Sequence, residues 1–533
     1  MPPHPPNRLS SLWRASARAR GFFSQAALAL AIAALLASGA RAQATPEADG
    51  DRLVRTEEGA RLFAESHQAL VDWRLEEAKR GFARLGEMEP GSPAGAYGLA
   101  KTALWEALVM ERPPFPQRFF ALNDSLEGVL IDMPRGLWRT HLEGERELQR
   151  ALMYLRQESF ARTGRAFHGA CGRFKENTRD AAEPFAESYL GRGACLVAAG
   201  SVPSEYKWVA ALLGFKGTVP DGIDAIQAAI DEAEIATPEA VILLALVDAA
   251  LNERGAGGTE ALGAVAAANP QSVLLAYLYG TMLLETRDAP GAERELRRAA
   301  ALMATPEASP LPYVDYHLGL TLYRQDRFEE AAELFESYLR AAPGRALVAQ
   351  ATLHAGLAYE LTGDRRTAEK HYRRVRATRD NDSDQQAERE AERRLAHPFT
   401  ASERAVILGA TAYDGGRNED AIEVLQPVFG DSDADETLRA EAAYRTGRAY
   451  QALGNDREAL RHYGFAIARP GDPLAKWGPW AVYHAGEVHE AAGDIDAARE
   501  AYERALENEE EFDYHKSLEQ RAKAALGRLD RAE

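Results

Sequence analysis

The chain has 533 residues, of which 46% are hydrophobic and 27% are charged, and its net charge at pH 7 is −18. This composition is that of a globular protein with ample core material, not of a disordered chain. Residues 1–44 carry five arginines and no acids, so the rest of the chain has a net charge of −23. Such an acidic protein is a poor partner for nucleic acids and for anionic lipid surfaces.

The N-terminus has the layout of a secretory signal peptide. Residues 1–20 carry four arginines, residues 26–37 form an apolar core, and small residues then offer cleavage sites ending at Ala42 or Ala44. The alternative is an uncleaved anchor, because the uncharged run 21–40 is just long enough to span a bilayer. We expect residues 1–44 to be removed and the mature chain, which has no other long apolar run, to be periplasmic or secreted without a membrane span.

We predict a helical N-terminal domain over residues 45–235, of which 95–235 is rich in helical patterns without a clear repeat. Residues 141–169 are expected to form one long helix. Cys171 and Cys195, the two cysteines of the chain, are 24 residues apart. That separation could place them opposite each other across one helical hairpin, where an oxidising compartment would allow a disulfide. Two buried thiols are the alternative. Runs of alternating β-branched residues are absent, which argues against strands.

A repeated pattern of small residues begins further along the chain. A glycine is followed 12 positions later by an alanine, and a large residue comes four positions after that alanine. Six such triplets occur, and their glycines are separated by 39, 37, 53, 38 and 39 residues. The triplets are Gly280/Ala292/Leu296, Gly319/Ala331/Phe335, Gly356/Ala368/Tyr372, Gly409/Ala421/Leu425, Gly447/Ala459/Tyr463 and Gly486/Ala498/Tyr502.

Each triplet predicts a pair of antiparallel helices. In "YHLGLTLYRQDRFEEAAELF" (316–335), apolar residues recur at helical spacing on both sides of the polar turn "RQDR". A glycine inside a helix costs about 1 kcal/mol relative to alanine. It is therefore expected where two helices approach closely, with the large residue filling the space beside the crossing.

The pattern resembles the tetratricopeptide repeat family, whose motif has a small residue, an alanine, an aromatic residue and often a proline in the order seen at Gly319, Ala331, Phe335 and Pro343. The resemblance implies an all-α solenoid of helical hairpins. We expect a repeat array over 238–510, a closing helix over 511–533, and a degenerate unit near 59–92 that contains Ala78 and Phe82.

Two segments depart from the regular repeat. The longest step between glycines contains the charged stretch 379–398, for which we predict a solvated helix extension or loop. Residues 206–233 have a faint resemblance to the inclusion-body-clearance family of tetratricopeptide proteins, and a plain helix–loop–helix is the alternative. The matching residues are Leu213, Gly214, Phe215, Gly217, Gly222 and Ile223.

The sequence offers little sign of catalysis. It has no His-Glu-x-x-His zinc motif, no Gly-x-Ser-x-Gly elbow and no phosphate loop of the form Gly-x4-Gly-Lys-Ser/Thr. We therefore predict no catalytic residues, no cofactor and no metal. The enzyme alternative would need an active site within the less repetitive region 95–235, with a carboxylate or histidine pair in hydrogen-bond reach.

Binding is the function that remains. In the family, the first helix of each hairpin lines the concave face of the array, so the resemblance implies a groove for a protein or peptide partner. By register, that groove includes Tyr313, Tyr316, Tyr323, Arg324, Tyr413, Tyr444, Arg448, Trp480, Tyr483 and Glu487. We predict a non-enzymatic scaffold that assembles or maintains envelope complexes. A glycan or cell-wall binder that uses the same aromatic residues is a further alternative.

Overall fold

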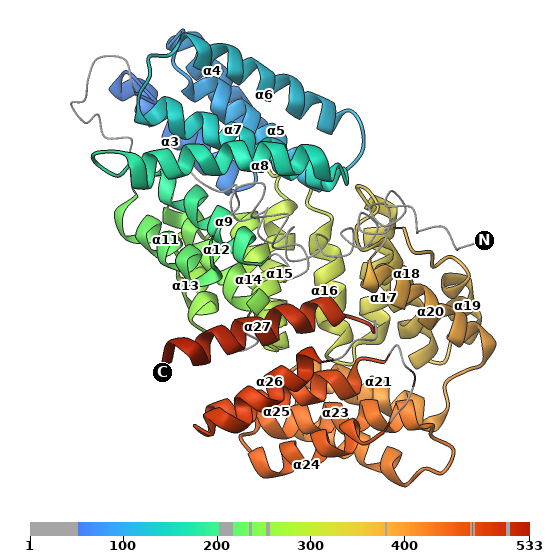
Figure 1. Ribbon diagram of the computed structural model, residues 1–533. Coiled ribbons are helices and arrows are strands. Elements are labelled where there is room, and N and C mark those ends of the chain that lie inside the picture. Colours follow the sequence, from blue (N-terminus) through green and yellow to red (C-terminus); the bar gives the residue numbers. More distant parts are fainter. Residues whose placement is uncertain are drawn as a thin grey trace, which may run out of the picture. The chain divides into compact units, whose positions relative to one another are not determined.

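The computed structural model describes residues 52–201, 217–233, 237–251, 256–378, 381–469, 472, 475–507 and 512–532 (Figure 1). Over these ranges every regular element is a helix and none is a strand, which confirms the predicted all-α fold.

The chain divides into two compact units. The first runs to Tyr279 and includes Arg298–Leu311, and the second comprises Gly280–Arg297 and Pro312–Glu533. The predicted signal peptide lies outside the described residues.

The first unit consists of helices in which consecutive members pack together. They are α3 (Glu57–Val71), α4 (Leu75–Met88), α5 (Ala94–Val109), α6 (Phe115–Asp132), α7 (Leu137–Arg156), α8 (Phe160–Lys175), η1 (Glu176–Asp180), α9 (Ser188–Gly200), α11 (Val219–Glu232), α12 (Thr237–Leu251) and α13 (Ala256–Ala268). Helices α14 (Val273–Glu285) and α15 (Ala289–Met303) are divided between the two units. The predicted array, which starts at 238, therefore begins within the first unit.

The degenerate repeat predicted near 59–92 overlaps the α3–α4 hairpin. Ala78 and Phe82 are buried on α4, and Ser66 lies on α3, 12 positions before Ala78. By contrast, the single long helix predicted over 141–169 is wrong. The chain turns between α7 and α8, where Glu158 has a φ of +57°, a left-handed conformation that cannot continue a helix.

The second unit is a series of hairpins followed by a last helix. The hairpins are α16–α17 (Tyr313–Tyr323, Phe328–Ala341), α18–α19 (Val348–Leu361, Arg365–Tyr372), α21–α22 (Ala401–Asp414, Asn418–Leu425), α23–α24 (Glu436–Ala452, Asp456–Ile467) and α25–α26 (Trp477–Ala491, Ile495–Leu506). A single turn, η3 (Gln426–Gly430), follows α22. Helix α27 (His515–Ala532) packs against α26 and α25, as expected of a closing helix.

The repeat glycines lie where the two helices of a hairpin meet. A Cβ atom on Gly447 would lie 2.7 Å from the Tyr463 ring, and one on Gly486 would lie 2.7 Å from the Tyr502 ring. The other four repeat glycines face their own large residue in the same way. Each glycine is thus required by a side chain of the second helix, which occupies the space that a Cβ would need.

A hydrogen bond joins the same positions in three hairpins. The large residue is a tyrosine there, and its hydroxyl donates to the side chain 12 residues earlier on the first helix. The pairs are Tyr372–Glu360 at 2.6 Å, Tyr463–Gln451 at 2.5 Å and Tyr502–Glu490 at 2.5 Å. The buried hydroxyl is thereby satisfied within its own repeat.

The charged stretch 379–398 forms an additional helix, α20 (Asp382–Ala396), that packs against α18 and α19. Ala387, Ala391 and Arg394 are buried on one of its faces. The expectation of a solvated segment is therefore wrong for that face. Its charged residues are kept in the interior by partners from other helices.

Cys171 on α8 and Cys195 on α9 form a disulfide, with their Cα atoms 5.7 Å apart. The bond connects helices separated by the turn η1. Among the residues that the structure describes, no helix has the length and apolar character needed to cross a membrane.

Candidate interaction surface

The ten predicted groove residues lie on or directly after the first helices of their hairpins, but most are enclosed. Six of the ten are less than 9% exposed: Tyr316, Tyr323, Tyr413, Arg448, Trp480 and Tyr483. The prediction that these six line an open groove is corrected accordingly, because neighbouring helices cover them. The other four are partly exposed: Tyr313, Arg324, Tyr444 and Glu487. Their role in binding stays a prediction.

Tilted and edge-to-face contacts with other rings explain the burial on α16. The Tyr316 ring lies 5.8 Å from Phe335 and 5.6 Å from Tyr338, both on α17. The Tyr323 ring lies 5.2 Å from Phe328 and 5.4 Å from His354. Burial raises the pKa of both tyrosines, so they remain neutral and contribute to packing.

The predicted residues on α23 and α25 gather around His484, which is fully buried. Its Nε2 lies 3.1 Å from the Tyr444 hydroxyl and also contacts the Arg448 guanidinium. Its Nδ1 lies 2.8 Å from a carboxylate oxygen of Glu487. Four groups from two helices thus form one polar network that fixes Tyr444 and Glu487 at the partly exposed edge.

Sequence reasoning missed His484, although the repeat contains a signal. His317, His354 and His484 each stand two positions before a repeat glycine. Burial lowers the pKa of His317 and His354 to about 4, so both are neutral at pH 7. A histidine recurring at one register position indicates a shared packing site on the first helix.

Cations and aromatic rings alternate beside this network. The Arg445 guanidinium lies 5.0 Å from the centre of the Trp477 ring and pairs with Glu441 at 2.8 Å. The Lys476 ammonium lies 5.1 Å from the same ring. Burial, followed by the charge of Arg445, lowers the pKa of Lys476 to about 8.

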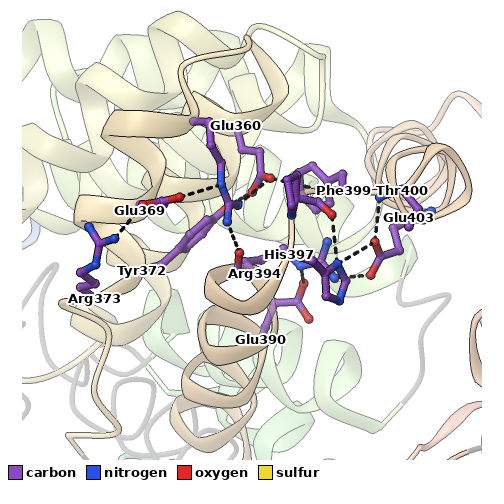
Figure 2. Close-up of polar contacts among 12 residues, drawn as sticks. Glu360, Glu369, Tyr372, Arg373, Glu390, Arg394, His397, Phe399, Thr400 and Glu403 are labelled. Carbon is purple, nitrogen blue, oxygen red and sulfur yellow. Dashed lines mark hydrogen bonds and ion pairs between the residues drawn. The ribbon is translucent and has the colours of Figure 1, made fainter.

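A second polar network attaches α20 to its neighbours (Figure 2). Glu360 on α18 accepts hydrogen bonds from Arg365 at 2.7 Å and from the backbone nitrogen of Phe399 at 3.2 Å. Arg394, 1% exposed, forms ion pairs with Glu390 and Glu403.

The two carboxylates of this network differ in their pKa values. Burial raises the pKa of Glu390. At Glu403 burial acts in the same direction, but hydrogen bonds from Arg394 and from the backbone of Thr400 outweigh it and lower the pKa to about 2. This anionic carboxylate and the buried guanidinium connect α20 to α21.

The first unit encloses its own charged cluster. His67 (α3), Lys101 (α5), Glu145 (α7) and Glu239 (α12) are each 1–2% exposed. His67 Nε2 lies 3.3 Å from a carboxylate oxygen of Glu239. Burial lowers the pKa values of His67 and Lys101 and raises that of Glu145 to about 7. A pair in near hydrogen-bond reach therefore exists, but enclosed side chains cannot meet a substrate.

Over the described part of the chain, no group of three or more His, Cys, Asp or Glu side chains is placed to hold a metal ion. A cleft of about 480 Å³ in the first unit is lined by the α3–α4 turn, the end of α5 and residues 306–310. Its lining includes Glu76, Arg80 and Glu106 but no histidine or cysteine. The residues that line this cleft therefore do not indicate a particular reaction or ligand.

Comparison with known proteins identifies two of the hairpins. Residues 313–344 and 481–512 each match the tetratricopeptide repeat, so the chain contains repeats of this family, as the sequence predicted. Both matches lie in the second unit. No curated protein matches the chain.

Several solved structures match the chain at low similarity. MamA protein is 21% identical over 37% of this chain and 90% of its own, with a TM-score of 0.19. Yeast Tom70 is 14% identical over 84% and 92%, with a TM-score of 0.31. A human IFIT1 dimer with PPP-AAAA is 16% identical over 82% and 94%, with a TM-score of 0.30. At these values the likenesses carry no argument about function.

The comparisons do not support the resemblance of 206–233 to the inclusion-body-clearance family. Leu213, Gly214 and Phe215 lie outside the described residues. A Cβ on Gly217 would lie 2.6 Å from Leu196, and one on Gly222 would lie 2.5 Å from Val197. These two glycines therefore have a packing explanation, since α9 approaches the backbone closely at both.

Proposed function

We propose that the chain is an exported, non-enzymatic scaffold whose second unit binds segments of partner proteins during assembly or maintenance of envelope complexes. The observation that carries the proposal is that Tyr313, Arg324, Tyr444 and Glu487, on or directly after the first helices of hairpins, are partly exposed. Two of these hairpins match the tetratricopeptide repeat. The repeat uses its fold to present side chains to other proteins, and aromatic residues and arginine are common anchors of such interfaces.

The test is photo-crosslinking from single positions in intact cells. A photoreactive amino acid replaces Tyr313 or Tyr444 in two variants and Gly464 in a matched control. Gly464 lies exposed on α24, a second helix, with open space around its Cα. We expect the same discrete protein adducts from Tyr313 and Tyr444 and none from Gly464. Equal labelling from all three positions would contradict a binding edge on the first helices.

Export needs its own measurement. N-terminal sequencing of the protein from envelope fractions is expected to give a start at Gln43 or Thr45, after cleavage at Ala42 or Ala44. An intact Met1 in the cytosolic fraction would remove the export part of the proposal and leave the scaffold part standing.

The enclosed positions of His67, Lys101, Glu145 and Glu239 support a non-enzymatic reading over an active site in the first unit. The glycan alternative would use the same partly exposed residues. Retention of the purified protein on isolated cell wall, lost when Tyr313 and Tyr444 are changed to Ala, would favour it.

A further inference from the structure

A short segment between α26 and α27 reaches back to the additional helix α20. We call residues 512–515 the strap. The Asp513 carboxylate pairs with the Arg389 guanidinium at 2.6 Å, and the Tyr514 hydroxyl donates to Gln386 Oε1 at 2.9 Å. The backbone nitrogen of Tyr514 donates to the Asp382 carboxylate at 3.2 Å. An ion pair, a side-chain hydrogen bond and a backbone hydrogen bond thus join the strap to residues of α20 that lie 124–132 positions earlier in the sequence.

Helix α20 uses one face for its own packing and a different face for the strap. Ala387, Ala391 and Arg394 are buried on one face of α20, which packs against α18 and α19. The strap face contains Asp382, Gln386 and Arg389, whose spacing of four and then three residues places them on one side of a helix. On this face Ser383 Oγ also lies 3.5 Å from the Tyr514 hydroxyl.

The ring of Tyr514 has a partner of its own. The Lys476 ammonium lies 4.2 Å from its centre, which ties the strap to the residue preceding α25. Burial raises the pKa of Tyr514, so its hydroxyl keeps the proton that it donates. The residue has a φ of +64°, a left-handed conformation that is unfavourable for an aromatic residue and is held here by the surrounding contacts.

The strap and α20 also act on the helix that the sequence predicted to contact ligands. Behind the larger effect of burial, Tyr514 and Asp384 help to raise the pKa of Tyr316 on α16. Glu390 of α20 likewise helps to raise the pKa of Tyr323 on the same helix, behind the larger effect of burial.

We propose that the α20 face formed by Asp382, Gln386 and Arg389 is a binding site for an extended segment of a partner protein in which an acidic residue precedes a tyrosine, and that the strap occupies this site as an internal ligand. In this site Arg389 pairs with the carboxylate of the acidic residue, and Gln386 accepts a hydrogen bond from the tyrosine hydroxyl. Asp382 accepts a hydrogen bond from the tyrosine backbone N–H, and the Lys476 ammonium lies over the tyrosine ring. The proposal rests on the proposed function, since it names the chemistry of the partner that the second unit binds.

Competition between the strap and the partner segment for the α20 face regulates partner binding. A partner can bind only the fraction of molecules whose strap has left α20, so the apparent affinity is reduced by that fraction. Covalent attachment holds the strap at a high effective concentration. A partner must therefore either bind α20 more tightly than the strap does or bring additional contacts.

The test uses a fluorescent synthetic peptide of residues 511–517 (Glu-Phe-Asp-Tyr-His-Lys-Ser) as the probe. Its anisotropy is titrated with the full mature chain, with Asp513→Ala/Tyr514→Ala, and with that double variant plus Arg389→Glu. We expect the double variant to bind the probe at least tenfold more tightly than wild type, and Arg389→Glu to abolish the gain. A peptide with Asp→Asn and Tyr→Phe should bind the double variant several-fold more weakly.

A matched control separates local from general charge effects. Arg366→Glu on α19 reverses an exposed charge outside the strap face and should leave probe binding to the double variant unchanged. Circular dichroism and hydrogen exchange over α20 show whether each variant keeps its helices. Equal binding by wild type and the double variant, or equal loss from Arg366→Glu and Arg389→Glu, would overturn the proposal.

Two further outcomes separate this proposal from the proposed function and from self-association. Adducts from Tyr313 and Tyr444 without any probe binding would leave the scaffold standing and remove the α20 site. If the wild-type chain sediments as a dimer that Arg389→Glu dissociates, the site belongs to the strap of a second copy and not to a partner protein.

Discussion

The two units keep their helices together in different ways. In the second unit, a small residue on the first helix of a hairpin meets a large side chain on the second, as at Gly447 and Tyr463. In the first unit, four helices far apart in the sequence meet at the buried groups of His67, Lys101, Glu145 and Glu239. The glycine contact recurs at one register position along the array, whereas the charged cluster of the first unit joins side chains of four helices that are distant in the sequence. The following predictions would break or sharpen this contrast.

Removal of the buried cation should have the largest effect. Lys101→Ala leaves Glu145 and Glu239 buried beside one another's charge without the ammonium, and loss of one partner of a buried charge group costs about 3–5 kcal/mol. Hydrogen exchange over α5 and α7 should report the loss. Arg373→Ala is the matched control, because Arg373 is 61% exposed and pairs only at the surface with Glu369, so about 1 kcal/mol or less is expected. Equal losses of stability in Lys101→Ala and Arg373→Ala would refute the contrast between the two units.

The pH dependence of the first unit should come next. The pKa of Glu145 is raised to about 7 in the folded chain, mainly by burial. The folded state then holds the proton more tightly than the unfolded state. The contribution of Glu145 to stability is therefore present below about pH 4.5 and is lost as the pH rises through 7, by roughly 3 kcal/mol.

The matched variant for that measurement is Glu145→Gln, which should remove this slope between pH 5 and 8. The lowered pKa of His67 gives a slope of the opposite sign below about pH 6.5, and comparison of the two proteins cancels it. Chemical unfolding at several pH values measures both. Parallel curves for wild type and Glu145→Gln would show that Glu145 does not titrate in this range.

Reduction of the disulfide should destabilise only the first unit. The bond closes a loop with a sequence separation of 24, for which loss of the cross-link costs roughly 3 kcal/mol. Denaturant midpoints with and without reductant, followed by hydrogen exchange over α8 and α9, test this. The double variant Cys171→Ser/Cys195→Ser should match the reduced protein and no longer respond to reductant. A response in α23 and α24 of similar size would contradict the assignment.

The smallest predicted effect concerns shape. Gly447→Ala places a Cβ 2.7 Å from the Tyr463 ring and should cost about 1–3 kcal/mol. Gly464→Ala, on the partner helix α24, meets nothing within 4 Å and should instead gain up to about 1 kcal/mol from helix propensity. Thermal unfolding of the two variants should thus move in opposite directions. Changes of the same sign would mean that the ring readily moves aside.

The array could be predicted from the sequence because its contacts are local and repeat. The glycine, the alanine and the large residue of one hairpin lie within 16 positions, so each repeat displays its own packing rule. The sequence also contains a more specific pairing rule for the large residue. Where the large residue is Tyr372, Tyr463 or Tyr502, the side chain 12 positions earlier is Glu or Gln, which accepts the hydroxyl. Where the large residue is Phe335, that position is the aromatic Tyr323.

The charged interiors could not be predicted, because each of them includes partners from other helices. In sequence, Arg394 belongs to a run of charges typical of a solvated surface, and only Glu403 and Glu390 make its burial tolerable. Lys101 likewise meets Glu145 and Glu239 only after three helices, α5, α7 and α12, have assembled. The groove prediction failed for Tyr316 and Tyr483 for a related reason, since register identifies the helix face but not what covers it.

The contact between the strap and α20 has a consequence for the order in which the second unit can be completed. The tyrosine bonds within a hairpin join residues 12 apart, whereas the strap bonds join residues up to 132 apart. Local contacts form early, and contacts between distant segments add a larger loop-closure entropy. As the chain leaves the ribosome from its N-terminus, hairpins α16–α19 and α20 can therefore fold before Asp513 and Tyr514 have been synthesised. The α20 face is then uncovered in every chain until the strap has been synthesised and has bound to it.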